Sequence, residues 1–379
     1  MDDSKTNFFD QILVEIQERD DRDTSKLIDK AFDYYRTPGV KKTRRTSPLK
    51  SQTQNGEVEV DGIDFNEFST LLDDLFQDQE TKKPFHIPRG WITDLFKKFD
   101  KNSDNILDKK EFTWLWVKWI QVILKPKSAL IIVDVQNDFI TGSLSVSNCP
   151  AGHRGEEVVP VINKILDEVS FDLVVYSYDW HPVDHVSFYE NVGKRKVIAK
   201  GGLPVNDDDN RLEDVQVFDE VTFEGPPRTD QKLWPKHCVQ RTWGAELHPD
   251  LRVHKDSINV FKGTNPIVDS YSAFWDNNKL SETGLGKELK DRGITDVFVC
   301  GLAYDVCVGS TAEHANEYGF RTTLIDDASR GVDNKGISEM KNKLIDKLTV
   351  VVDSSRVRAM VQGQERRPEH GYHLSTFLK

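Results

Sequence analysis

The feature that most constrains the fold is a regular alternation of two kinds of segment between residues 129 and 352. Six short runs are rich in β-branched residues, as buried strands are. They span 129–133, 173–177, 258–261, 296–300, 322–325 and 348–352. Segments with helical periodicity separate several of these runs, at 156–169, 284–292, 306–318 and 334–344. This alternation predicts an α/β domain with a mainly parallel sheet that helices cover on both faces.

Chemically useful side chains follow four of the predicted strands. Asp134 follows the first strand, Asp179 and His181 end the second, and Lys262 ends the third. Cys307 comes shortly after the fourth strand, behind a glycine turn. For a cysteine alone, a buried structural role is the simpler interpretation. Because ligands of such sheets bind beyond the carboxyl ends of the strands, however, we expect these groups to meet at one edge, with Cys307 as a nucleophile.

Six ordered motifs carry a resemblance to a known family. They are Val133-Asp-Val-Gln-Asn-Asp-Phe139, Asp179-Trp-His-Pro182, Leu233-Trp-Pro-Lys-His-Cys-Val239, Phe261-Lys-Gly263, Tyr271-Ser-Ala-Phe274 and Gly301-Leu-Ala-Tyr-Asp-Val-Cys-Val308. The segment that contains them, 129–352, resembles the nicotinamidase branch of the isochorismatase-like hydrolases. The resemblance implies a small-molecule substrate, nicotinamide, which is hydrolysed to nicotinate and ammonia in NAD salvage.

The resemblance also implies a catalytic triad of Asp134, Lys262 and Cys307. Asp134 can take the thiol proton, and the charge of Lys262 can favour the thiolate. Cys307 would then attack the carboxamide carbon and form a thioester. The backbone N–H groups of Cys307 and Ala303 are the expected oxyanion donors, and the bond between Leu302 and Ala303 matches one that is often cis in the family.

Three residues are implied as ligands of a divalent metal, for which we expect zinc. Asp179 and His181 are two positions apart, so on an extended strand both side chains point the same way. His237 completes a three-ligand set that leaves an open position. His185 matches a position that ligates metal in some relatives, and the sequence leaves open whether it is a ligand or supports the other ligands.

Four aromatic residues are candidates for the walls of a pocket that holds a flat heteroaromatic ring. They are Phe139, Trp234, Tyr271 and Tyr304. For each of them alone, packing in the core is an equally good interpretation. Two other functions stay open: a related carboxamide amidase or isochorismatase-like hydrolase, and a calcium-binding protein whose α/β domain is inert.

The spacing of the apolar residues in 1–125 predicts a separate helical module. Within it, loop 100–111 resembles the calcium-binding loop of an EF-hand. The Ca²⁺ ligands implied by this match are Asp100, Asn102, Asp104, the carbonyl of Ile106, and Glu111. The loop has Asn105 where the family expects glycine, but asparagine tolerates the left-handed turn required there. A degenerate partner loop is expected near 56–67, and a purely structural helical bundle is the alternative.

The predicted domains are therefore the helical module at 1–125, the hydrolase-like domain at 127–355 and a peripheral C-terminal extension at 356–379. The polar stretch 190–231 is expected to be a solvated excursion without assignable chemistry. The basic pairs within 41–45 are either part of a solvated linker or a nuclear address.

Composition excludes several classes of function. A formal net charge of −12 argues against a nucleic-acid surface, because phosphate backbones are bound by clustered Lys and Arg. The longest apolar stretch, 114–124, is too short to span a bilayer, and the polar start of the chain does not resemble a secretory signal. Only four Cys occur, and none are in CxxC spacing. We expect a cytoplasmic protein, with a nuclear location and a homo-oligomer left open.

Overall fold

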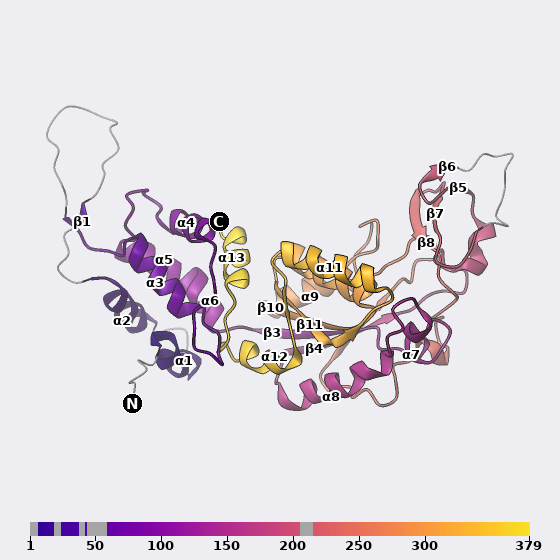
Figure 1. The fold of residues 1–379 in the computed structure, drawn as a ribbon, viewed down its shortest axis with the longest axis horizontal. Coiled ribbons are helices and arrows are strands. Elements are labelled where there is room, and N and C mark those ends of the chain that lie inside the picture. The colour runs from indigo at the N-terminus through magenta and orange to yellow at the C-terminus, as the bar shows by residue number, and fades with distance from the viewer. Residues whose placement is uncertain (1–6, 19–23, 38–41, 44–58, 205–214) are drawn as a thin grey trace. The chain divides into compact units, whose positions relative to one another are not determined.

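The computed structural model of the chain describes residues 7–18, 24–37, 42–43, 59–204 and 215–379. It divides the chain into two compact units, Lys127–Arg358 and a helical unit that combines Met1–Pro126 with Ala359–Lys379 (Figure 1).

Among the described residues, no helix has both the length and the apolar character needed to cross a membrane. Of the basic pairs within 41–45, only Lys42 falls in the described part, so the nuclear address stays a prediction.

The larger unit is built on a six-stranded sheet in the order β12-β11-β10-β3-β4-β9, and every neighbouring pair is parallel. Its strands are β3 (Ser128–Val133), β4 (Leu173–Asp179), β9 (Ile258–Lys262), β10 (Asp296–Leu302), β11 (Arg321–Arg330) and β12 (Val350–Val352). The predicted parallel α/β fold is thus confirmed. The chain adds β4 and β9 on one side of β3 and then returns to place β10 on the other side. This reversal brings the ends of β3 and β10 together, where ligands bind in such sheets.

Helices cover both faces of this sheet (Figure 1). The longer ones are α8 (Val158–Glu168), α9 (Leu285–Asp291), α10 (Gly309–Glu317) and α11 (Asn334–Asp346), and the boundary between the two units falls within α12 (Ser354–Val361). Leu289, Ala312 and Leu344, one from each of α9, α10 and α11, share a buried core with strand residues such as Ile131 and Val299. Burial of this apolar surface is the main stabilising contribution to the unit. The shorter helical elements are α7 (Asn137–Ile140), the π-helix η8 (Tyr304–Val308), and 3₁₀ turns at Val146–Asn148, Gly155–Glu157, Tyr189–Lys194 and Trp243–Ala245.

A second, four-stranded antiparallel sheet in the order β6-β5-β7-β8 corrects one prediction. Its strands are β5 (Val197–Lys200), β6 (Leu203–Pro204), β7 (Glu220–Phe223) and β8 (Thr229–Lys232). The stretch 190–231 is therefore not simply a solvated excursion. Its apolar residues Val221 and Phe223 alternate with polar ones and bury a small core together with Val186 and Leu233.

The helical unit contains α1 (Phe8–Glu18), α2 (Ser25–Tyr35), α3 (Phe65–Leu75), α4 (Arg89–Phe99), α5 (Lys109–Leu115), the π-helix η2 (Trp116–Ile120), α6 (Gln121–Leu124), the short strands β1 (Lys42–Thr43) and β2 (Glu59–Val60), and α13 (Pro368–Phe377). The prediction of a peripheral extension at the C-terminus is wrong for α13. Trp119 Nε1 donates to the Gly371 carbonyl oxygen at 2.7 Å, and the rings of Trp91 and Tyr372 stack with their centroids 4.5 Å apart. These contacts span large sequence separations, so local patterns did not reveal them.

Candidate active site

The candidate active site lies beyond the carboxyl ends of four adjacent strands, β10, β3, β4 and β9. Asp134 follows β3 in a left-handed conformation, with φ of 49°, which turns the chain away from the sheet. Asp179 is the last residue of β4, and Lys262 is the last residue of β9. Cys307 lies in η8, one turn after the end of β10. The structure therefore brings the four groups together as the sequence led us to expect.

Lys262 is the electrostatic centre of the site. Its ammonium group lies 2.8 Å from Asp134 Oδ2 and 3.4 Å from Cys307 Sγ. It also forms an ion pair with Asp179 and donates to the Ser270 carbonyl oxygen at 3.1 Å. All three ionisable groups of the implied triad are almost completely removed from solvent. Their mutual interactions are therefore much stronger than those of surface charges.

Burial shifts the pKa values of all three triad residues. Burial raises the pKa of Asp134 to about 6, although Lys262 opposes this shift. Burial alone would lower the pKa of Lys262, but the carboxylates of Asp134 and Asp179 outweigh it and hold the pKa well above its usual value. Burial also raises the pKa of Cys307 well above the ordinary range, and the charge of Lys262 only partly offsets this. Burial thus works against the thiolate at Cys307, and the charge of Lys262 works in its favour, as the sequence led us to expect.

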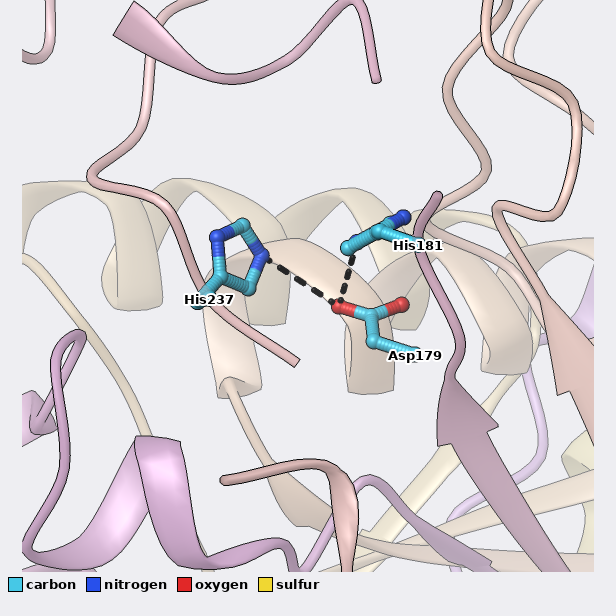
Figure 2. Close-up of side chains that lie close together, drawn as sticks. All are labelled: Asp179, His181 and His237. Atoms are coloured by element: carbon cyan, nitrogen blue, oxygen red, sulfur yellow. Dashed lines mark ion pairs between the residues drawn. The ribbon is translucent and has the colours of Figure 1, made fainter. Parts of the chain in front are cut away.

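Asp179, His181 and His237 form a compact set of donor atoms (Figure 2). Asp179 Oδ2 lies 3.4 Å from His181 Nε2 and 3.6 Å from His237 Nε2. Nδ1 of His181 faces the Gly263 carbonyl oxygen at 2.9 Å, and Nδ1 of His237 faces that of Pro235 at 2.7 Å. A carbonyl oxygen only accepts, so each Nδ1 carries a proton, and in the neutral ring each Nε2 can offer its lone pair to a metal ion. Two imidazole nitrogens and one carboxylate oxygen are a donor set that fits zinc.

His185 lies next to this set without joining it directly. Its ring stacks on that of His181 with centroids 4.1 Å apart, and its Nδ1 lies 2.7 Å from Ser187 Oγ. Its Nε2 is 3.9 Å from Asp269 Oδ1, and these two residues form a second donor group with His181. Burial lowers the pKa of His185 well below its usual value, so the ring is neutral and can ligate or support.

A cavity opens next to Cys307. Phe139, Trp234 and Tyr271 line it, together with Ala303. Trp234 Nε1 and the Tyr271 hydroxyl lie 3.4 Å apart, which ties two of the walls together. The aromatic walls suit a flat ring.

The prediction of a ring contact from Tyr304 is wrong. Tyr304 packs in the core beneath the sheet, and its hydroxyl donates to Asp326 Oδ1 at 2.9 Å. The π-helical turn over Tyr304–Val308 directs Cys307 toward the cavity, whereas Tyr304 at its start points into the core.

The bond between Leu302 and Ala303 is cis, as the resemblance implied.

Comparison with known proteins identifies the domain. The family model described as "Isochorismatase domain" matches residues 128–356. The chain belongs to the isochorismatase family. Within this family it is similar to the nicotinamidases of Acinetobacter baylyi, at 37% identity, and Escherichia coli, at 36% identity. Each alignment covers 55% of this chain, and 83% and 84% of the respective relative. The solved structure of an Acinetobacter baumanii nicotinamidase pyrazinamidase matches with a TM-score of 0.51 and 34% identity, over 61% of this chain and 98% of that chain.

Sequence reasoning missed several residues of this isochorismatase site. Ser177 Oγ donates to Asp134 Oδ1 at 2.6 Å and thereby orients the carboxylate. Its position two residues before Asp179, on the same side of β4, was a usable signal. Val332 also lines the cavity, from the loop after β11, and no motif marked that loop. Ser270 contributes through its backbone carbonyl oxygen, for which the sequence carries no signal.

The helical unit contains the loop that resembles an EF-hand, and its acidic side chains turn inward. Asp100 Oδ1 and Oδ2 accept the N–H groups of Asp104 at 3.1 Å and Asn105 at 2.9 Å. Asn102 Oδ1 also accepts from Asp104, at 2.9 Å, and Asn105 adopts the expected left-handed conformation with φ of 66°. Glu111 Oε1 accepts from the N–H of Lys101 at 2.8 Å. Asp100, Asp104 and Glu111 are buried, which is unusual for acids unless a partner compensates them.

This loop pairs with a second loop in the same unit. Leu107 and Ile63 exchange two backbone hydrogen bonds, of 2.8 and 3.0 Å, in an antiparallel bridge. Both loops end in the same capping box, formed by Asp108 with Glu111 and by Asp64 with Glu67. Positions 56–58 of the predicted degenerate loop lie outside the described residues.

Proposed function

We propose that the isochorismatase domain hydrolyses nicotinamide to nicotinate and ammonia through a thioester on Cys307, in NAD salvage. The observation that carries the proposal is the position of Cys307 Sγ. It lies 3.4 Å from the Lys262 ammonium, beside Asp134, and on the wall of an aromatic cavity that also exposes the metal-type donors. The similarity to nicotinamidases supports the choice of substrate.

The first half of the reaction forms the thioester. As Cys307 Sγ attacks the carboxamide carbon, its proton passes to the Asp134 carboxylate, because the buried thiol does not ionise by itself. Lys262 stabilises the negative charge that develops on the sulfur. The backbone N–H groups of Ala303 and Cys307, both on the cavity wall, are the proposed donors to the oxyanion. Asp134 then gives the proton to the amine nitrogen, the C–N bond breaks, and ammonia leaves.

The second half of the reaction releases nicotinate. Asp134, again ionised, takes a proton from a water molecule, and the resulting hydroxide attacks the thioester carbon. The C–S bond breaks, and the proton on Asp134 returns to Cys307 Sγ, which restores the neutral thiol. A pKa near 6 suits this use of Asp134 as base and then acid near neutral pH.

Asp179, His181 and His237 are proposed to hold a zinc ion. When bound, it would supply an open coordination position for a pyridine nitrogen or a water molecule. Asp179 bonds Lys262 through its other oxygen, so the proposed ligands and the triad share one electrostatic network.

The test is an ammonia-release assay with nicotinamide on the wild type and on Cys307→Ala. Cys300→Ala is the matched control, because Cys300 is also buried but lies within β10, away from the cavity wall. We expect loss of turnover only in Cys307→Ala. Activity that survives this substitution would refute the thioester mechanism. Wild-type protein that is inactive on nicotinamide but active on another carboxamide would refute the substrate.

We also propose that loop 100–111 of the helical unit binds one calcium ion. The observation that favours this is the set of buried carboxylates turned into the loop by its own N–H groups, with Asn105 in the left-handed conformation. Calorimetric titration should give one site in the wild type and none in Glu111→Gln. Glu67→Gln is the matched control, because Glu67 has the same capping-box position in the partner loop. Unchanged calcium binding in Glu111→Gln would refute the site.

A further inference from the structure

Among the buried polar residues of the motif that supplies Asp134, Gln136 and Asp138 have no role in the proposed reaction. Both side chains bond to the backbone of segments that carry the proposed metal ligands. Their contacts therefore lead from the catalytic motif to the metal-type donor set.

The side chain of Gln136 binds both the N–H and the carbonyl oxygen of Asp179. Its Oε1 accepts the Asp179 N–H at 2.9 Å, and its Nε2 donates to the Asp179 carbonyl oxygen at 2.8 Å. The same Nε2 donates to the Ala245 carbonyl oxygen at 2.9 Å. The regular pairing of β3 with β4 ends at Ile132 and Tyr176, before β4 reaches Asp179. On the β3 side, the side-chain amide of Gln136 thus replaces the pairing that β4 has lost at its ligand-bearing end, whereas β9 still pairs there through Asp179 and Lys262.

Asp138 binds the backbone of Cys238, the residue that joins the two histidine segments. Its Oδ2 accepts the N–H of Cys238 at 2.7 Å, and its Oδ1 accepts that of Ser143 at 3.0 Å. Cys238 directly follows His237, and its carbonyl oxygen accepts the N–H of His181 at 3.0 Å. Cys238 has a left-handed φ of 45°, a conformation that a non-glycine residue keeps only when its surroundings hold it. The Asp138 carboxylate provides such a restraint.

Two glycines leave room for this carboxylate. A Cβ atom on Gly244 would lie 2.0 Å from Asp138 Oδ2, and one on Gly142 would lie 2.2 Å from Asp138 Oδ1. No side chain fits at either position unless Asp138 moves. The site is therefore built around Asp138 in its present orientation.

We propose that Gln136 and Asp138 are positioning residues that fix the backbone of the metal ligands Asp179, His181 and His237. This inference rests on the zinc site proposed above. Groups that orient ligands without touching the metal commonly change metal affinity by about 10- to 100-fold when they are replaced. One short motif then supplies the catalytic acid and also holds the ligand geometry.

The primary test is Asp138→Asn in the full-length protein. An asparagine has nearly the same shape, but its NH₂ group faces one of the two N–H donors, so one hydrogen bond is lost. We expect zinc affinity, measured by competition with a chromophoric chelator, to fall at least about tenfold. The visible spectrum of the cobalt-loaded protein should change as well, since it reports ligand geometry. Asn137→Ala is the control: Asn137 is buried in the same turn, but its side chain bonds the Trp243 carbonyl oxygen instead of a ligand segment. It should keep both readouts.

Two further variants keep the proposal testable if Asp138→Asn does not fold. Gln136→Glu keeps an acceptor for the Asp179 N–H but removes both donors, and Gly244→Ala displaces the Asp138 carboxylate without removing it. Each should lower zinc affinity. Wild-type zinc affinity and an unchanged cobalt spectrum in a folded variant of Gln136 or Asp138 would overturn the positioning role. A wild-type protein that binds no zinc would instead refute the metal site itself.

Discussion

Removal of the charge of Lys262 should destabilise the domain strongly and in a pH-dependent way. Lys262 is 1% exposed, and its ammonium group lies 2.8 Å from Asp134 Oδ2 and also pairs with Asp179. In Lys262→Met the side chain keeps a similar length, but the two buried carboxylates face each other without a cation. Each then carries an uncompensated desolvation cost.

The magnitude follows from the geometry of the pair. At an effective dielectric constant of about 20, two charges 2.8 Å apart attract by about 6 kcal/mol. The net loss is smaller because the variant can protonate one carboxyl group, and breaking a buried pair typically costs about 3–5 kcal/mol. We therefore expect the free energy of unfolding to fall by about 3–5 kcal/mol at about pH 8.

The sign of the pH effect follows from Asp134. Burial already raises the pKa of this carboxyl to about 6, and the loss of the lysine charge will raise its pKa further. A carboxyl group whose pKa is higher in the folded state than in the unfolded state binds its proton more tightly when folded. Its stabilising contribution is present at low pH and is lost as the pH rises through the folded-state pKa. The deficit of Lys262→Met should therefore be smaller at about pH 5 than at about pH 8.

Urea unfolding of the metal-free protein at both pH values measures the effect. Lys287→Met is the matched control, because Lys287 is exposed and pairs with Asp291 on a helix surface, and we expect no resolvable change. The double variant Asp134→Asn/Lys262→Met should recover part of the lost stability, since one of the two facing charges is gone. A loss below about 1 kcal/mol at about pH 8, the size expected of a surface pair, would refute this reasoning. So would a loss that is the same at both pH values.

Three further predictions concern different parts of the chain. Because the pKa of Asp134 is raised to about 6, kcat/KM for nicotinamide should fall as the pH drops below about 6. A kcat/KM that does not change with pH in this range would contradict the role of Asp134 as the base. Gly301→Ala should lower the free energy of unfolding by about 2–5 kcal/mol. The reason is that φ of Gly301 is 121° and that the new Cβ would lie 2.1 Å from the Val133 carbonyl oxygen. Gly90→Ala is the control, because a Cβ at Gly90 meets open space. Burial raises the pKa of Glu111, so calcium must displace a more tightly held proton. Calorimetry should show calcium affinity falling as the pH drops through this raised pKa, and equal affinity at about pH 5 and about pH 7 would contradict it.

Most of the parallel sheet could be predicted because its signal is local. The central strands β3 and β10 are short apolar runs that are buried on both faces, and the helices between the strands show their own periodicity. The grouping of Asp134, Asp179, Lys262 and Cys307 followed from the same signal, since parallel strands carry their carboxyl ends to one edge. Motif resemblance then placed His237, which lies on no strand of this sheet.

The parts that escaped prediction depend on contacts between distant segments. The sheet within 190–231 and the packing of α13 on Trp119 arise from pairing partners that no local pattern specifies. Tyr304 was placed in the pocket because motif position alone does not tell which way a π-helical turn directs a side chain.

By itself, the sequence determined the fold class and the chemical identity of the site, because strand periodicity and residue type are written into short segments. Only the tertiary structure decided the protonation of that site. Burial raises the pKa values of Cys307 and Asp134, and burial depends on the whole fold rather than on neighbours in the chain. The tertiary structure also determined the contacts from which we infer the positioning role of Gln136 and Asp138. Their hydrogen bonds reach across 43 and 100 residues to the ligand segments, a distance at which the sequence alone shows no partner.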